Sequence, residues 1–123
     1  MSHIVTVQTQ VKDATAVRAA CQRLGLPEPV QGTTKLFSGE ATGLAIQLPG
    51  WIYPVVADTA NGQVKFDNFS ERWGDQICLD RFLQGYAVER ARAEARNRGH
   101  QCTEAQLPDG SIKLTITVQG GAA

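Results

Sequence analysis

Hydrophobic and polar side chains alternate most regularly near the end of the chain. Residues 112–118 read Ile-Lys-Leu-Thr-Ile-Thr-Val, so every second side chain is apolar. This period of two is typical of a β-strand with one buried face. The same alternation, with valines on one side, predicts a strand over residues 3–11. Shorter runs predict four more strands, over residues 44–48, 53–58, 64–67 and 101–107.

Two stretches carry apolar side chains at helical spacing. The first begins after Asp13, a suitable N-cap, and ends at Gly25. The second is much longer and covers about residues 76–98. Gly85 lies inside it and marks either a close approach to another backbone or a late start of the helix. The apolar stripe expected to lie on the sheet comprises Leu79, Phe82, Leu83, Tyr86 and Ala87.

Two dipeptides mark hairpin turns, Asn61-Gly62 and Asp109-Gly110. Both tolerate the positive φ that a type I′ turn requires at each central residue. Tight hairpins join antiparallel strands, and strands with one apolar face need their helices on that face. The pattern therefore predicts an α+β two-layer sandwich, a mostly antiparallel sheet with two helices on one face. The expected order of elements is β-α-β-β-β-α-β-β.

Length and composition place residues 1–123 in a single domain. The chain is 42% hydrophobic and 20% charged, which is ordinary for a globular protein that buries one core. Residues 53–118 form the predicted core block. Residues 27–43 are broken by prolines and glycines and are expected to be an irregular loop. Residues 119–123 are expected to be a frayed tail.

Charge and hydropathy argue against several classes of function. Twelve basic residues balance twelve acidic ones, so no global positive field favours binding to nucleic acid. No apolar run approaches the ~20 residues that span a bilayer, and the first residues lack the pattern of a signal peptide. Three widely spaced cysteines favour a reducing compartment over a disulfide scaffold. We therefore expect a cytoplasmic protein that binds neither membrane nor nucleic acid.

The sequence shows no pattern typical of a cofactor or metal site. It contains no His-x-x-His and no Cys-x-x-Cys pair, and Gly-Thr-Thr-Lys at residues 32–35 lacks the spacing of a phosphate loop. His100, Cys102 and Glu104 would share one face of a strand. Same-face neighbours lie roughly 6.6–7 Å apart, too far for a hydrogen-bonded catalytic pair. An enzyme is therefore the least favoured hypothesis, and no cofactor is expected.

Two surface features favour a protein partner. Trp51 and Tyr53 form an aromatic corner, which either covers the edge of the core or anchors a partner. In the long helix, small residues lie opposite the sheet-facing stripe, where a helix from this chain or a partner would approach closely. Arginines in the same half of the helix are either solvated or contact an acidic partner. The predicted partner-binding residues are Trp51, Tyr53, Val88, Ala91, Arg92, Ala95 and Arg96.

Scattered signatures along most of the chain resemble a known family. They are Met1-Ser2-His3, residues 9–13 (Thr-Gln-Val-Lys-Asp), residues 53–58 (Tyr-Pro-Val-Val-Ala-Asp), Phe82-Leu83, Tyr86-Ala87, Gly99 and residues 109–112 (Asp-Gly-Ser-Ile). Together they resemble the conserved hypothetical chloroplast frame 35 family of algae and cyanobacteria, a domain of unknown function. The loops and the Ala/Arg-rich helix end depart from the family pattern. The resemblance implies a small soluble protein, often encoded near AAA+ ATPases, and transfers no functional residues.

These observations support two main hypotheses about function. The leading one is a small non-enzymatic interaction protein, an accessory of an AAA+ ATPase or a subunit of a small complex. The alternative is a protein that binds a small molecule or nucleotide, with residues 32–43 as a lid. In addition, an exposed edge strand would allow two copies to pair as a homodimer.

Overall fold

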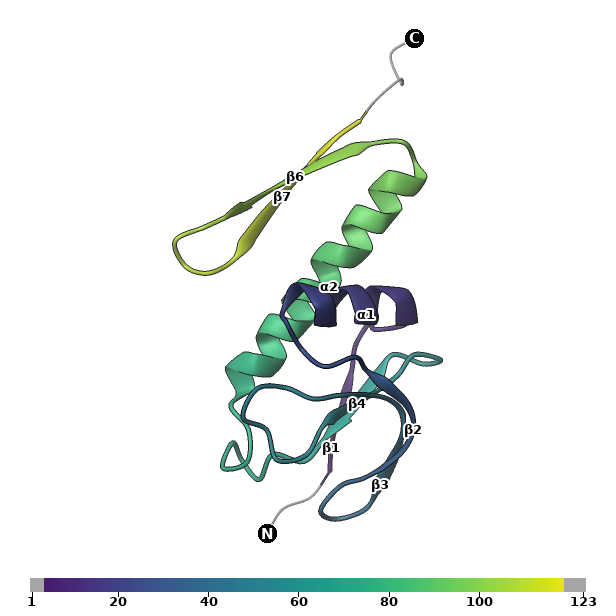
Figure 1. Cartoon of the computed structure of the whole chain (residues 1–123), viewed down its shortest axis with the longest axis vertical. Helices are drawn as coiled ribbons and strands as arrows, with labels where there is room; N and C mark the ends of the chain where they lie inside the picture. Colours follow the sequence, from purple (N-terminus) through teal and green to yellow (C-terminus); the bar gives the residue numbers. More distant parts are fainter. Residues whose placement is uncertain (1–3, 119–123) are drawn as a thin grey trace.

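The computed structural model describes residues 4–118, which form two helices and seven strands. In chain order these are β1 (Val5–Gln8), α1 (Ala14–Arg23), β2 (Val30–Lys35), β3 (Glu40–Ile46), β4 (Val55–Asp58), β5 (Gln63–Phe66), α2 (Gln76–Asn97), β6 (Gln101–Gln106) and β7 (Ile112–Thr117). Five strands make one antiparallel sheet in the order β1-β5-β4-β3-β2, and β6 pairs with β7 in a second sheet (Figure 1). The predicted α+β class is confirmed. The predicted tail at 119–123 and the opening Met1-Ser2-His3 lie outside the described residues.

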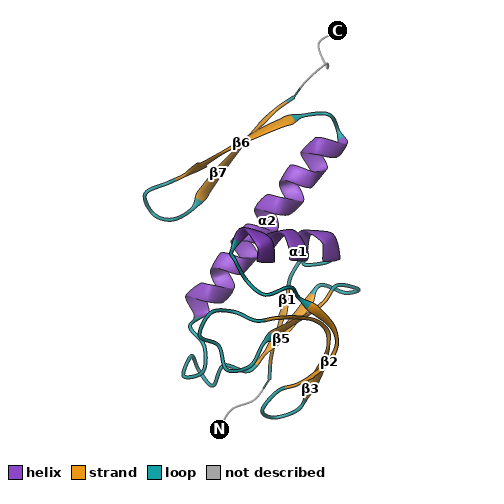
Figure 2. Ribbon diagram, viewed as in Figure 1, coloured by secondary structure: helices purple, strands orange, loops and turns teal. Residues whose placement is uncertain are grey.

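Both helices pack on one face of the five-stranded sheet (Figure 2). The core between the layers combines Val17 and Cys21 of α1, Ile46 and Val55 of the sheet, and Phe82 of α2, all buried. Burial raises the pKa of the Cys21 thiol, which keeps it protonated and unreactive. In the predicted stripe of α2, Leu79, Phe82 and Tyr86 are buried, Leu83 is half-buried and Ala87 is exposed.

The helices begin and end close to the predicted positions. The carboxylate of Asp13 accepts hydrogen bonds from two N–H groups in the first turn of α1. Gly25 follows α1 with a φ of 68°, a left-handed conformation that glycine adopts at little cost. The carboxylate of Asp75 caps α2 by accepting one such hydrogen bond, from the N–H of Ile77 at 3.0 Å. Local side-chain chemistry therefore sets both helix starts.

Gly85 lies where α1 crosses α2. A Cβ at this position would be 3.5 Å from Cδ of Arg23 and 3.6 Å from Cδ1 of Leu24, ordinary van der Waals distances. The helix runs through Gly85 without interruption, so the hypothesis of a late helix start is wrong. The nearest atoms belong to side chains of α1 and of its C-cap Leu24, not to backbone.

The Gly85→Ala variant is expected to be more stable than the wild type by about 0.5–1 kcal/mol. Alanine restricts the unfolded chain and favours the helix, and its methyl group fits the available space. Urea unfolding followed by circular dichroism measures this difference. A decrease in stability would show that α1 packs more tightly on α2 than these distances indicate.

Residues 27–43 are largely ordered as a hairpin, so the predicted irregular loop is wrong. β2 and β3 pair over six residues, from Val30↔Ala45 to Lys35↔Glu40. The glycines read as strand breakers lie inside the strands, where Gly32 and Gly43 are direct cross-strand partners. Residues 32–35 and 40–43 belong to the sheet, so of the predicted lid at 32–43 the turn at 36–39 lies outside the strands.

The two predicted turns occur at the expected positions, but they are not of type I′. The strands pair up to Asp58↔Gln63 and Gln106↔Ile112, so both connections are longer than two residues. Among the described residues of these turns, Gly62 and Gly110 have positive φ, whereas the preceding Asn and Asp do not. An Asn-Gly or Asp-Gly pair is therefore also compatible with a longer hairpin loop in which the glycine alone is left-handed.

The second hairpin does not join the main sheet, although a single sheet was predicted. β6 and β7 pair with each other and lie beside the C-terminal half of α2 (Figure 1). α2 is 22 residues long. At 1.5 Å per residue it carries the chain roughly 33 Å, beyond the reach of the main sheet.

The far face of the main sheet is not bare, in contrast to the predicted one-sided sheet. Val55 and Val56 are neighbours on opposite faces of β4, and both are buried. The turn after β2 brings Leu36 onto the face away from the helices. This second cluster contains Leu36, Ala41 and Val56, with Ile4, Ala45 and Tyr53 packed against it.

Candidate partner-binding surface

Aromatic side chains from three segments gather around Trp73. The ring of Phe69 stacks on Trp73 with a centroid distance of 4.8 Å. Phe37, from the turn between β2 and β3, lies at 5.1 Å, and Tyr53, just before β4, lies at 5.8 Å. Phe37 is 58% exposed. Ile52, whose N–H donates a hydrogen bond to the Trp73 carbonyl at 2.9 Å, is 59% exposed. We call these five residues, Phe37, Ile52, Tyr53, Phe69 and Trp73, the aromatic surface.

The loop that carries Phe69 and Trp73 is held in a strained conformation. Phe69, Ser70 and Glu71 have φ values of 48°, 52° and 73°. For residues with a Cβ, the left-handed conformation costs roughly 1–2 kcal/mol each. Backbone hydrogen bonds from the N–H of Trp73 to the Asn68 carbonyl (2.9 Å) and from Arg72 to Phe69 (3.1 Å) close the loop. These hydrogen bonds hold Phe69 over Trp73 in spite of the strain.

Two further contacts fix the same loop to its surroundings. The guanidinium of Arg72 lies 5.1 Å from the centroid of Phe69, a cation–π geometry. The carboxylate of Glu71 accepts a hydrogen bond (3.0 Å) from the N–H of Gln76, at the start of α2. The loop is thus fixed both to its own aromatic ring and to the following helix.

A buried carboxylate connects the loop to the turn that carries Phe37. Asp67 is 1% exposed, and its Oδ2 accepts a hydrogen bond from Oγ of Ser38 at 3.1 Å. Its Oδ1 is buried and accepts no hydrogen bond within residues 4–118. Burying an unpaired polar atom costs free energy. The aromatic surface therefore adjoins a second unfavourable feature besides the strained loop.

The structure separates the two residues of the predicted aromatic corner. Trp51 is buried, packs edge-on against Phe66 and donates a hydrogen bond from Nε1 to the Asp75 carbonyl at 3.0 Å. The interpretation of Trp51 as a core residue is confirmed. Tyr53 is half-buried on the other side of the sheet and belongs to the aromatic surface.

Sequence reasoning missed three of the residues in this surface, Phe37, Phe69 and Trp73. Each lies in a loop or turn between predicted strands and helices, where periodicity carries no information. The available signal was that two aromatic residues lie in the otherwise polar stretch 68–75. Their proximity to Phe37 depends on the sheet.

The small-residue face of α2 is covered by this chain and is not open to a partner helix. Val88 and Ala95 are buried and Ala91 is half-buried. The hairpin β6–β7 packs beside this half of the helix (Figure 2). At the hairpin tip, Nε2 of Gln84 donates to the Gly110 carbonyl at 3.5 Å. The sequence left open whether a helix of this chain or of a partner approaches this face, and the element of this chain that lies beside it is a hairpin, not a helix.

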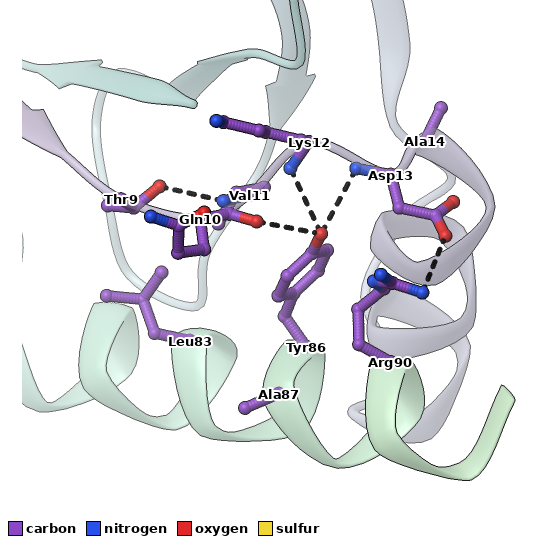
Figure 3. A pocket seen from close by; sticks show the side chains of 10 residues that line it. All are labelled: Thr9, Gln10, Val11, Lys12, Asp13, Ala14, Leu83, Tyr86, Ala87 and Arg90. Carbon is purple, nitrogen blue, oxygen red and sulfur yellow. Dashed lines mark hydrogen bonds and ion pairs between the residues drawn. The ribbon is translucent and has the colours of Figure 1, made fainter. Parts of the chain in front are cut away.

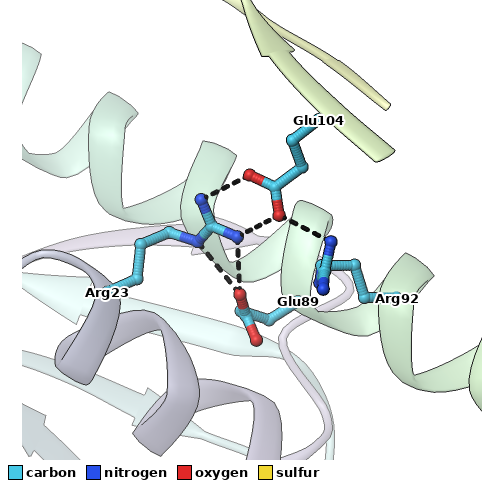
Figure 4. A network of polar contacts seen from close by, with 4 residues as sticks. All are labelled: Arg23, Glu89, Arg92 and Glu104. Carbon is cyan, nitrogen blue, oxygen red and sulfur yellow. Dashed lines mark hydrogen bonds and ion pairs between the residues drawn. The ribbon is translucent and has the colours of Figure 1, made fainter. Parts of the chain in front are cut away.

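A network of charged side chains ties the hairpin to both helices (Figure 4). Nη2 of Arg23 lies 2.7 Å from a carboxylate oxygen of Glu89 and 2.6 Å from one of Glu104. Arg92 also contacts Glu104, at 2.9 Å. Of the predicted partner-binding arginines, Arg92 thus lies in this internal network, whereas Arg96 is exposed.

The network also bears on the hypothesis of an enzyme. The hydrogen bond from Arg23 lowers the pKa of Glu104. The carboxylate of Glu104 lies within ion-pair distance of two guanidinium groups, those of Arg23 and Arg92. No hydrogen bond joins His100, Cys102 and Glu104 in the described part of the chain. The hydrogen bonds that Glu104 accepts come from Arg23.

Glu104 is expected to give the protein an acid-sensitive contribution to stability. Because its pKa in the folded state is lowered, this contribution is fully present above the unfolded-state pKa of about 4.3 and is lost as the pH falls through the folded-state pKa. Glu104→Gln is expected to cost about 1 kcal/mol near neutral pH, and nothing at a pH where Glu104 is protonated. Urea unfolding of the wild type and the variant, at neutral pH and at a pH where Glu104 is protonated, measures this difference in stability. Glu94→Gln is the control, because Glu94 forms an exposed ion pair with Arg98. A cost that does not change with pH would contradict the prediction.

A cleft of about 770 Å³ lies between residues 9–14 and α2 (Figure 3). The hydroxyl of Tyr86 holds residues 10–13 against α2 at this cleft. It accepts hydrogen bonds from the N–H groups of Lys12 (3.0 Å) and Asp13 (3.1 Å), and it donates one to the Gln10 carbonyl (3.1 Å). Arg90 contacts Asp13 at 3.6 Å on the rim. The volume lies within the range of small-molecule sites.

Metal sites and membrane-spanning helices are two further features that would bear on function. Between residues 4 and 118, no group of three or more His, Cys, Asp or Glu side chains could hold a metal ion. Within the same range, neither helix combines the length and the apolar character needed to cross a membrane.

The fold and its surface define an α+β domain with a constrained aromatic surface. Comparison with protein-family models, curated proteins and solved structures found no match to this chain. The resemblance to the chloroplast frame 35 family therefore remains a prediction.

Proposed function

We propose that this protein is a small, non-enzymatic interaction module of the cytoplasm that binds a protein partner through the aromatic surface. Aromatic residues dominate the binding energy of many interfaces, and exposed apolar patches commonly mark such sites. Phe37 and Ile52 supply exposed apolar area, while the packed rings of Phe69 and Trp73 provide a rigid base. Rigid aromatic anchors lose little conformational entropy on binding.

The main observation behind this proposal is the left-handed backbone conformation of three consecutive residues, Phe69, Ser70 and Glu71. Strain of this kind persists where the surrounding structure enforces it, and it clusters at ligand clamps and other functional sites. Here it presents an aromatic ring on the surface and adjoins Asp67, whose buried Oδ1 has no hydrogen-bond partner in the described part of the chain. A connection that served only to link β5 to α2 would need neither feature.

The resemblance to the chloroplast frame 35 family suggests a class of partner. An AAA+ ATPase, or another subunit of a small complex, is the kind of partner the family context implies. The aromatic surface fits a partner that presents an apolar side chain or segment.

The experiment compares partner capture by three versions of the tagged chain, the wild type, Phe37→Ser and Val30→Ser. Phe37 is exposed, so the serine variant keeps the core intact. Val30, on the edge strand β2, is also exposed and lies outside the aromatic surface. The expected result is a partner captured by the wild type and Val30→Ser and lost with Phe37→Ser. A partner held equally by all three versions would contradict the proposal, and mass spectrometry would show whether it is an ATPase.

A second candidate function is binding of a small molecule or nucleotide in the cleft beside residues 9–14. The observation in its favour is a volume of about 770 Å³, whose lining includes the cationic Lys12 and Arg90 and the apolar Leu83 and Ala87. A thermal-shift screen with nucleotides and metabolites tests it. Ala87→Trp, at an exposed helix position, would fill the cleft, so a genuine ligand should stabilise the wild type and not this variant. If no compound raises the midpoint, this candidate is excluded.

A further inference from the structure

The two-stranded sheet β6–β7 leaves part of its apolar stripe uncovered. Isolated hairpins are marginally stable in water and need further strands or packing. The face toward α2 carries Ile112 and Leu114, which are half-buried. Farther along the same face, Ile116 is 43% and Val118 is 67% exposed. The stripe therefore extends beyond the area that the helix covers.

Among residues 4–118, no strand pairs with the outer edge of β7. The N–H of Leu107 donates to the Ser111 carbonyl at 2.8 Å, which identifies these two as a hydrogen-bonded pair. Because such pairs alternate along an antiparallel ladder, Ile112, Leu114 and Ile116 direct their N–H and C=O groups toward the free edge. These are the residues of the apolar stripe.

β7 lacks the features that normally protect an edge strand, such as short length, proline, several charges or a bulge. It pairs with β6 in an unbroken register over six residues. Its sequence contains one charge, Lys113, and no proline. The other edges are protected, because β1 has four residues and β2 contains Gly32 in a positive-φ conformation. On β6, the carboxylate of Glu104 lies in the middle of the corresponding stripe.

We propose that β7 pairs with β7 of a second copy of this chain, antiparallel and edge to edge, to form a four-stranded sheet across a twofold axis. An axis through Leu114 sets Ile112 opposite Ile116 of the second copy and Lys113 opposite its Thr115. Apolar side chains then meet apolar ones, and no like charges are opposed. The occupant is a second copy because the pattern of β7 is its own complement when the strand direction is reversed.

The test measures the mass of the wild type in solution over a wide range of concentrations, together with Ile116→Lys and Val30→Lys. Ile116 is partly exposed, so a lysine there keeps its ammonium in water when the chain is monomeric. Val30 is an exposed valine on the edge of the other sheet and serves as the matched control. We expect a concentration-dependent dimer whose dissociation constant rises at least about tenfold in Ile116→Lys and is unchanged in Val30→Lys.

Amide hydrogen exchange locates the contact and reports on folding. Dimer formation should slow the exchange of the Ile112, Leu114 and Ile116 amides. The Thr115 amide, which faces β6, should be protected in monomer and dimer alike. Continued protection of Thr115 in Ile116→Lys would show that the hairpin remains folded. A strictly monomeric wild type, or a dimer in which the exchange of Leu114 is not slowed, would overturn the proposal.

Failure of this proposal is distinguishable from failure of the proposed partner binding. The aromatic surface lies on the main sheet and the loop before α2, away from the hairpin (Figure 1). Phe37→Ser should therefore leave the dimer unchanged, and Ile116→Lys should leave partner capture through the aromatic surface unchanged.

Discussion

Replacement of Phe82 by alanine is expected to lower the free energy of unfolding by about 3–5 kcal/mol. Phe82 is 1% exposed and lies between the sheet and α1 in the main core. The variant loses the transfer free energy of the ring and leaves a cavity, which the two helices and the sheet cannot close without disturbing other contacts. The helix itself is unaffected, since alanine is the best helix former.

Equilibrium unfolding in urea or guanidinium measures this loss. Phe37→Ala is the matched control, because it removes the same atoms from an exposed ring and should cost well under half as much. Similar costs for the two variants would show that Phe82 is not a central core residue.

The second large effect is expected for Gly43→Ala, at roughly 3 kcal/mol or more. A Cβ on Gly43 would overlap the carbonyl oxygen of Ala57 in β4, the neighbouring strand. This atom is backbone and cannot move without separating β3 from β4. The cost is therefore steric and arises in the centre of the sheet.

The cross-strand partner of Gly43 provides an unusually close control. Gly32 has a φ of 155° and Gly43 a φ of 153°, and no atom lies within 4 Å of a Cβ on Gly32. Gly32→Ala therefore carries the backbone strain without the overlap, and it should cost about 1–2 kcal/mol. The difference between the two unfolding free energies isolates the steric part. Equal costs would contradict the close packing of β3 on β4.

Much of the local structure is predictable because it depends on neighbouring residues in the sequence. Asp13 and Asp75 cap helices through atoms only a few residues away. Most of the predicted stripe of α2 is buried because helical geometry sets the spacing of its residues. The positions of both hairpin turns follow from Gly62 and Gly110, whose positive φ is a local property.

The misinterpretations all concern relations between distant segments. Gly32 and Gly43 looked like strand breakers because their direct pairing becomes visible only when the hairpin forms. Val88 and Ala95 appeared open because the hairpin that packs beside this half of α2 was assigned to the main sheet. Trp51 and Tyr53 are two residues apart, yet one enters the helix-facing core and the other the opposite cluster.

The sequence by itself determined the α+β class, the helix starts, the hairpin positions and the main core-facing stripe, because these depend on periodicity and local hydrogen bonding. Only the tertiary structure decided that the last hairpin stands apart from the main sheet, and that Phe37, Tyr53, Phe69 and Trp73 form one surface. The physical reason is that long-range contacts depend on where α2 and the β2–β3 turn place their neighbours in space. No pattern within a short window of sequence carries that information.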